Sequence, residues 1–210
     1  INYDYTDGLS QTNISKLIDN QVDNLTKPNG FVDAKSEYAY IFEPHEYYTQ
    51  AAIYKILDHG LRVKTATRKF SINGKKYDYG TYMIQVQNQK LNSDEIYELL
   101  NDVSKKYNIR FESQPTGITD GIDLGSDYFI IVKQPKIALI VGDGVRSYDA
   151  GEIWHLLDTR YDIPISKLDV DDLEYIELSK YSHIILPDYY GKKISSDQIN
   201  EYVTNGGNLI

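Results

Sequence analysis

The residues best placed to do chemistry stand in a glycine-containing loop after a strongly apolar stretch. Residues 142–147 read Gly-Asp-Gly-Val-Arg-Ser, and they separate the strand pattern of residues 136–141 from a helical pattern that begins at Tyr148. In a parallel α/β sheet, ligands bind at the carboxyl ends of strands, and the free amides of a helix start favour an anion. The loop matches neither the dinucleotide pattern G-x-G-x-x-G nor a phosphate-binding loop with Gly-Lys-Ser/Thr, and Asp143 would repel a phosphate. A structural turn with Ser147 as the helix cap is therefore the favoured interpretation, and a ligand-binding loop is the alternative.

A second loop follows the third strand of the same pattern, where residues 186–191 read Leu-Pro-Asp-Tyr-Tyr-Gly. A nucleophile elbow needs a serine or cysteine in G-x-S/C-x-G after a strand, and this loop offers neither. If the chain binds a small ligand, the two loops should share it, because they follow strands expected to be neighbours in one sheet. The candidate ligand-binding residues are Gly142, Asp143, Gly144, Ser147, Tyr148, Asp188 and Tyr189. No catalytic set can be assembled from them.

The four histidines do not form a metal-binding pattern, and we expect no metal site in this segment. His45 is followed by Glu46 but lacks a second histidine one helical turn later, as a zincin motif requires. His155-Leu-Leu-Asp158 loosely resembles the H-x-x-E of zinc carboxypeptidases, but it lies inside a helical pattern without a third ligand, so a helix-terminal or core histidine is favoured. His183, at the start of an apolar strand, is expected to be structural. Because the chain has no cysteine, thiolate metal sites, disulfides and a cysteine nucleophile are excluded.

Composition argues against nucleic acid as a partner and against a membrane span. The 210 residues carry a net charge of −9, and the stretch from Pro135 onward holds 7 basic against 13 acidic residues. An acidic surface repels polyphosphates instead of attracting them. No apolar run approaches the ~20 residues that a membrane helix needs. Twenty tyrosines against five phenylalanines leave two interpretations open, a codon habit of an AT-rich genome and an aromatic surface that binds peptide or carbohydrate.

Residues 38–134 are predicted to form a small mixed α/β domain with the element order β-α-β-β-α-β. Its clearest signals are the hairpin turn at Asn73-Gly74 and a capping box at residues 92–95, which read Asn-Ser-Asp-Glu. The helix that follows should bury one face made of Ile96, Leu99, Leu100, Val103 and Tyr107. Residues 1–37 are polar, and only a short stretch of them has helical spacing, so we expect the tail of a preceding domain or a linker.

Residues 135–210 are predicted to form a second domain in which strands and helices alternate. The strands expected are 136–141, 163–168 and 183–186, and the helices are 148–158, 171–178 and 196–204. This order is typical of a flavodoxin-like parallel sheet, with consecutive strands joined by right-handed crossovers. Because a fourth strand has barely begun at Ile210, we expect this domain to be truncated.

Several stretches together resemble one known family. They are residues 136–158, which contain Gly-Glu-Ile-Trp-His-Leu-Leu-Asp at 151–158, together with residues 42–60, 116–125, 178–188 and 202–210. They are similar to the C-terminal region of secreted zinc carboxypeptidase A-like peptidases of Bacteroidetes-type bacteria, so the resemblance extends over residues 38–210. In that family a small α/β region and a domain similar to class I glutamine amidotransferases follow the peptidase domain. The resemblance implies that zinc and its ligands belong to that upstream domain and not to this segment.

The function implied by the resemblance is that of a non-catalytic accessory region in a periplasmic or secreted zinc carboxypeptidase-like protein. Its partner would be the upstream peptidase domain, which it would pack against or assist in substrate recognition, with a peptide or glycan as a further ligand. The alternative is an independent peptide- or carbohydrate-binding module of periplasmic type, with tyrosines lining a cleft between the two domains. A third reading, an amidotransferase-like enzyme, would need a nucleophile just beyond Ile210, and Asp188-Tyr189 replaces the usual Gly-Gly of that fold.

Overall fold

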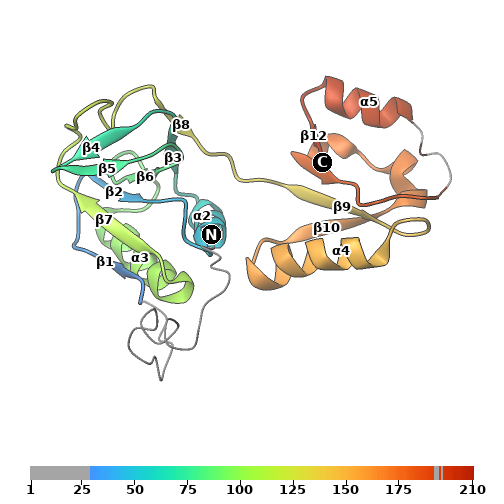
Figure 1. The fold of residues 1–210 in the computed structure, drawn as a ribbon, viewed down its shortest axis with the longest axis horizontal. Helices are drawn as coiled ribbons and strands as arrows, with labels where there is room; N and C mark the ends of the chain where they lie inside the picture. The colour runs from blue at the N-terminus through green and yellow to red at the C-terminus, as the bar shows by residue number, and fades with distance from the viewer. Residues whose placement is uncertain (1–28, 192–193, 195) are drawn as a thin grey trace, which may run out of the picture.

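The computed structural model describes residues 29–191, residue 194 and residues 196–210, and it has a mixed α/β fold (Figure 1). One lobe is built on a six-stranded sheet and the other on a four-stranded sheet. An extended stretch between strands β8 (Phe129–Ile131) and β9 (Ile137–Val141) joins the two lobes, and the expected linker at Gln134-Pro135 lies within it. The short helical pattern predicted near the start of the sequence lies outside the described residues.

The sheet of the first lobe has the strand order β1-β7-β2-β6-β3-β8. Its strands are β1 (Phe31–Val32), β2 (Ala39–Phe42), β3 (Lys64–Ala66), β6 (Tyr82–Gln85), β7 (Arg110–Gln114) and β8. β1 pairs with β7 in parallel, whereas the other strand pairs of this sheet are antiparallel. Val32, which precedes the predicted domain start at residue 38, packs in the core of this lobe. A strand of two residues is too short to produce an alternating pattern that could be recognised in the sequence.

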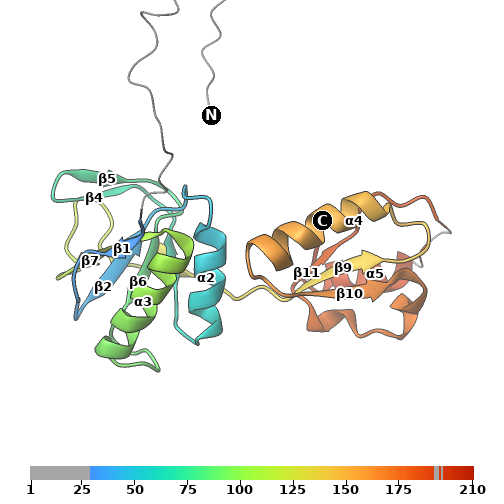
Figure 2. The ribbon, with the colours of Figure 1, turned by 90° about the horizontal axis from the view of Figure 1, so that it is seen from below.

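Two helices, α2 (Thr49–Asp58) and α3 (Ser93–Tyr107), lie side by side on one face of this sheet (Figure 2). The capping box predicted at the start of α3 is confirmed. The Asn92 side chain accepts hydrogen bonds from the amides of Asp94 and Glu95, both at 3.0 Å, and the Glu95 carboxylate accepts the Asn92 amide at 2.8 Å. The predicted apolar face of α3 is buried against α2 and the sheet, with Leu99 partly exposed.

A β-hairpin covers the opposite face of the six-stranded sheet. Its strands are β4 (Phe70–Ile72) and β5 (Lys75–Tyr77), and they meet at the predicted turn, where Asn73 has φ 51° and Gly74 has φ 81°. These left-handed conformations suit a two-residue hairpin turn, which explains the Asn-Gly pair. Phe70 and Tyr77 stack with ring centroids 5.0 Å apart, and both are buried against the sheet. The first lobe therefore has three layers, with helices on one side of the sheet and a hairpin on the other.

The second lobe contains a sheet of four strands that are all parallel, as predicted. In spatial order they are β10 (Ile165–Asp169), β9, β11 (His183–Ile185) and β12 (Asn208–Leu209). Helices α4 (Ser147–Trp154) and α5 (Ser196–Thr204) lie on opposite faces of this sheet (Figure 1). Ala138, Leu139 and Ile140 are all buried, because the central strand β9 is covered on both faces.

Two of the predicted helices of this lobe differ from the structure. The expected helix 171–178 is two short 3-10 turns, Val170–Tyr175 and Leu178–Lys180. Leu173 and Leu178 are both buried in the same core, yet five residues of α-helix would turn them about 140° apart. The chain therefore has to break between them. The expected helix 148–158 is α4 followed by a π-helical turn, His155–Arg160.

The end of that π-helical turn contacts the first lobe. The ring of Tyr161 lies 5.7 Å from that of Tyr47 and 6.3 Å from that of Tyr48. Next to it, the Asp162 carboxylate accepts a hydrogen bond from the Tyr107 hydroxyl at 2.8 Å and pairs with Lys106 at 2.7 Å. We call these six residues the inter-lobe junction. Four of the twenty tyrosines thus pack against each other between the lobes.

Candidate functional site

The structure brings together the two loops in which ligand-binding residues were predicted. The Arg146 amide donates to the Asp188 carbonyl at 2.9 Å, and the Tyr190 amide donates to the Gly144 carbonyl at 2.9 Å. Val145 and Tyr189 form an isolated antiparallel bridge between the two loops. The predicted proximity of the loops is therefore confirmed, whereas their role in binding a ligand stays a prediction.

The loops fill the space between them with their own atoms. Gly144 is buried with φ 83°, and a Cβ on it would lie 2.4 Å from the Cα of Gly191. Gly142 has φ 107°, and a Cβ there would lie 2.5 Å from Oδ1 of Asp169. Both positions need glycine because the backbone is left-handed and a neighbour lies close. This close packing agrees with a structural turn, which was the favoured interpretation of this loop.

Most polar side chains of these loops are exposed to solvent. Arg146 and Asp188 form an exposed ion pair at 3.0 Å. Tyr148 and Asp143 are exposed. Ser147 does not cap α4, so that prediction was wrong: Arg146 is the N-cap residue, and Ser147 is already the first helical residue. α4 therefore starts one residue earlier than the sequence suggested.

A pocket of about 240 Å³ opens beside the first loop, between α4 and the edge strand β10. We call it the α4–β10 pocket. Its lining residues are Leu139, Val141, Gly142, Val145, Ser147, Ala150, Gly151, Trp154 and Lys167. The Lys167 ammonium lies 4.8 Å from the centroid of the Trp154 ring, within the range of a cation–π contact. Gly142 and Ser147 were among the candidate ligand-binding residues predicted from the sequence, whereas Trp154 and Lys167 were missed. Trp154 could have been noticed because it is the only tryptophan of the chain.

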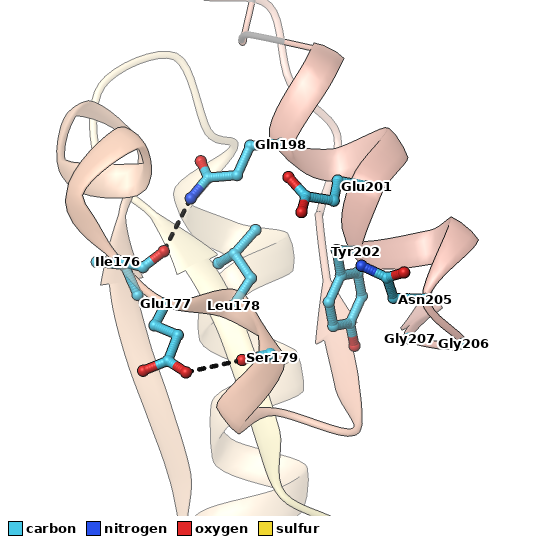
Figure 3. A pocket seen from close by; sticks show the side chains of 10 residues that line it. All are labelled: Ile176, Glu177, Leu178, Ser179, Gln198, Glu201, Tyr202, Asn205, Gly206 and Gly207. Carbon is cyan, nitrogen blue, oxygen red and sulfur yellow. Dashed lines mark hydrogen bonds between the residues drawn. The ribbon is translucent and has the colours of Figure 1, made fainter.

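A larger groove, of about 340 Å³, lies on the other face of the same sheet, between α5 and residues 176–179 (Figure 3). We call it the α5 groove. The carboxylates of Glu177 and Glu201 come from its two walls, and Leu178 lies between them. Gln198 donates to the Ile176 carbonyl at 2.8 Å and so ties the walls together. The groove was not predicted, since its residues match no motif and come from segments that are distant in sequence.

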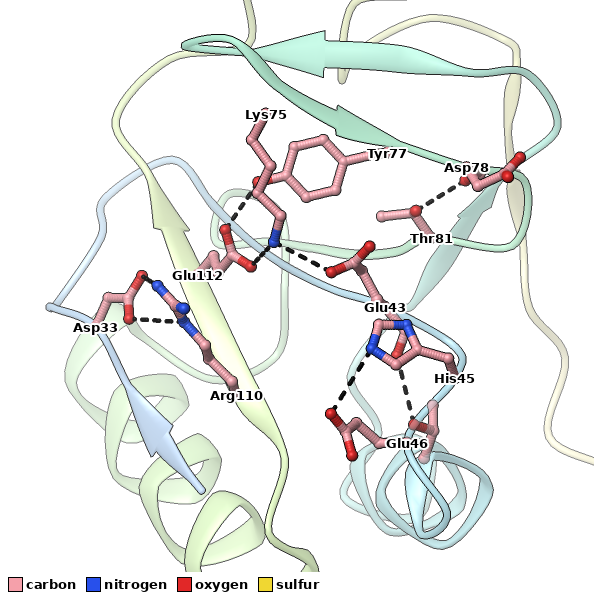
Figure 4. A network of polar contacts seen from close by, with 11 residues as sticks. Asp33, Glu43, His45, Glu46, Lys75, Tyr77, Asp78, Thr81, Arg110 and Glu112 are labelled. Atoms are coloured by element: carbon pink, nitrogen blue, oxygen red, sulfur yellow. Dashed lines mark hydrogen bonds and ion pairs between the residues drawn. The ribbon is translucent and has the colours of Figure 1, made fainter. Parts of the chain in front are cut away.

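A polar network ties the β4–β5 hairpin to the sheet of the first lobe (Figure 4). Glu112, whose side chain is only 12% exposed, accepts a hydrogen bond from the Tyr77 hydroxyl at 2.8 Å and pairs with Lys75. Lys75 also pairs with Glu43 at 3.1 Å. Burial and then the Glu112 carboxylate raise the pKa of Tyr77. Partial burial alone would lower the pKa of Lys75, but the Glu112 and Glu43 carboxylates together outweigh it, so the pKa is raised. The network thus holds a neutral phenol and a charged amine at neutral pH, and we assign it a structural role.

The described part of the chain contains no group of three or more histidine, cysteine, aspartate or glutamate side chains arranged to hold a metal ion. His155 is exposed at the start of the π-helical turn, and the His183 ring nitrogen Nδ1 lies 2.9 Å from the Ser182 hydroxyl. Within the same residues, no helix is both long and apolar enough to cross a membrane.

Comparison with protein-family models, curated proteins and solved structures finds no match to this chain.

Proposed function

We propose that this chain is a non-catalytic accessory region of a periplasmic or secreted zinc carboxypeptidase-like protein, and that it packs beside the peptidase domain. The observation that carries the proposal is the filled crevice at the ends of β9 and β11. Enzymes with doubly wound sheets keep this crevice open for substrate. Here Gly144 lies against Gly191, and backbone hydrogen bonds close the loops on each other.

The strand order of the second lobe supports the same proposal. The order β10-β9-β11-β12 corresponds to the first four strands of a flavodoxin-like sheet, in which the first strand stands between the second and the third. Class I amidotransferase-like domains are expected to have such a sheet, in line with the resemblance of residues 136–210. Asp188 and Tyr189 are used for contacts with the first loop, which leaves them unsuited to the role of a Gly-Gly oxyanion loop.

The edge strand β8 offers a surface for packing. Ile131 is 61% exposed and Ile130 is exposed as well, although both belong to a strand. Exposed branched residues on an edge strand favour association with another protein surface. We infer that the peptidase domain covers this edge.

The test measures zinc-dependent hydrolysis of C-terminally free and blocked peptides by the full gene product and by a version without residues 1–210. Without this region, the enzyme should still hydrolyse C-terminally free peptides, but with an altered KM. In the full gene product, Ile131→Lys should reproduce that change, whereas Ile118→Lys, at an even more exposed loop position, should not. Hydrolysis of the same peptides by the isolated chain would overturn the proposal.

A second candidate function, a peptide- or carbohydrate-binding module, is favoured by the two hollows of the second lobe. The α4–β10 pocket and the α5 groove combine apolar floors with a few charged groups, as small-molecule sites do. A thermal-shift screen with sugars, amino acids and peptides separates the two functions. A region that only packs should show no shift, and a binding module should show a saturable one.

A further inference from the structure

The α4–β10 pocket exists because the helix carries small residues where it faces the edge strand. Ala150 and Gly151 line it, and a Cβ on Gly151 would meet no atom within 4 Å. A cavity of about 150 Å³ is enough for one benzene ring. The 240 Å³ here therefore hold a single ring with a short substituent.

The walls of the pocket suit a flat apolar group. Leu139, Val141 and Val145 provide aliphatic surface from the sheet and the loop. Trp154 stands at the far end of α4, and the residue is 39% exposed although it has the largest apolar side chain of the lobe. An indole face that is partly open can stack on an aromatic ring with an offset or an edge-to-face geometry.

The two ends of the pocket carry opposite charges. The Lys167 ammonium lies near Trp154, and no ion pair joins it to a carboxylate among the residues that the structure describes. At the opposite end, next to Gly142, stands the Asp169 carboxylate, which accepts the Asp171 amide at 3.0 Å. A ligand anion is therefore attracted to the Lys167 end and repelled from the Gly142 end.

We propose that the α4–β10 pocket binds a small aromatic carboxylate, with the ring between Trp154 and the aliphatic wall and the carboxylate on Lys167. The inference rests on the binding role given above as the second candidate and does not depend on the accessory role. It names a ligand class and two specificity-determining residues, Trp154 and Lys167.

The single tryptophan makes the test specific, because its fluorescence reports only on this pocket. The full chain is titrated with phenylacetate, with phenethylamine as the cationic analogue of similar shape. Phenylacetate should give a saturable change of tryptophan fluorescence, and phenethylamine should give none. Equal responses to both compounds, or no response to phenylacetate, would overturn the proposal.

Variants separate the contributions of charge and of space. Lys167→Gln should weaken phenylacetate binding about tenfold, the equivalent of one charge-assisted hydrogen bond. Lys180→Gln removes a cation that pairs with Glu177 beside the α5 groove and should leave binding unchanged. Gly151→Leu should abolish binding by filling the pocket, and circular dichroism checks that it folds. Unchanged affinity in Lys167→Gln would overturn the assignment of the carboxylate.

The fluorescence titration and the thermal-shift screen together distinguish failure of this inference from failure of the binding role. If phenylacetate leaves the fluorescence unchanged while a sugar or peptide raises the melting temperature, the pocket assignment is wrong and the binding module stands. If no compound of either class has an effect, both are wrong.

Discussion

Asp162 at the inter-lobe junction allows the contributions of backbone, hydrogen bond and charge to be measured separately. It adopts φ 53°, which is left-handed, and its carboxylate accepts the Tyr107 hydroxyl and pairs with Lys106. Asparagine tolerates this conformation and keeps an acceptor, but it has no charge. Glycine tolerates it without an acceptor, and alanine offers neither advantage.

The sizes of the effects follow from exposure. The side chains of Lys106 and Asp162 are 57% and 45% exposed, so Asp162→Asn should cost less than about 1 kcal/mol. Tyr107 is buried, and Asp162→Gly leaves its hydroxyl without this acceptor at a cost of about 1–2 kcal/mol. Asp162→Ala adds about 1 kcal/mol of left-handed strain and should be the least stable variant.

Urea unfolding at neutral pH measures these differences, with circular dichroism for both lobes and tryptophan fluorescence for the second lobe. The expected order of stability is wild type, Asn, Gly, Ala. Equal stability of the Ala and Asn variants would refute the reasoning, since neither the acceptor nor the backbone would then matter. A Gly variant less stable than the Ala variant would refute the backbone part alone.

The pH dependence of the stability difference between the wild type and Asp162→Asn tests the role of the charge. The hydrogen bonds from Lys106 and then from Tyr107 lower the pKa of Asp162. A lowered pKa in the folded state means that the stabilisation is fully present above the ordinary aspartate value of about 4 and is lost as the pH falls below it. The difference between wild type and Asp162→Asn should therefore shrink toward zero in acid. A difference that stays constant down to pH 3 would contradict the assignment.

Two further predictions concern the glycine of the filled crevice and the buried network. Gly144→Ala should destabilise the protein by about 2–4 kcal/mol, because the alanine is strained at this φ and overlaps with the facing loop. Gly74→Ala has a similar φ but open space around it, so it should cost only about 1 kcal/mol. Thermal melting compares the two variants, and equal losses of stability would contradict the close packing at Gly144. Tyr77→Phe should cost about 1 kcal/mol, and Glu112→Leu about 2 kcal/mol because it removes both the acceptor of the Tyr77 hydroxyl and one of the two carboxylates that pair with Lys75. Urea unfolding of the single and double variants measures this, and strictly additive losses would show that the two side chains do not interact.

Local signals in the sequence predicted those parts of the fold that depend on neighbouring residues. The capping box of α3 and the Asn-Gly turn were found because their hydrogen bonds and φ values are set within four residues. The parallel sheet of the second lobe was predicted from its apolar strands and alternating helices. The break between Leu173 and Leu178 was missed because it depends on a shared core, which helical periodicity does not describe.

The candidate site was predicted only in part for the same reason. The two loops could be placed side by side, since parallel strands end at one edge of a sheet. That Gly144 would be packed against Gly191 could not be predicted, because the contact joins segments almost fifty residues apart. Likewise, Lys167 meets Trp154 only after the chain has crossed from α4 to β10. Contacts of this kind decide whether a loop is open to a ligand.

The inter-lobe junction and the extended stretch between β8 and β9 connect the lobes twice, once covalently and once through side chains. The stretch keeps Tyr161 and Asp162 near their partners, so the junction forms as an intramolecular contact with an effective concentration of about 1 mM or more. Contacts too weak to hold two free proteins together are then sufficient to hold the lobes. Cleavage by a protease near Gln134 would remove this advantage, and the lobes would separate by dilution alone.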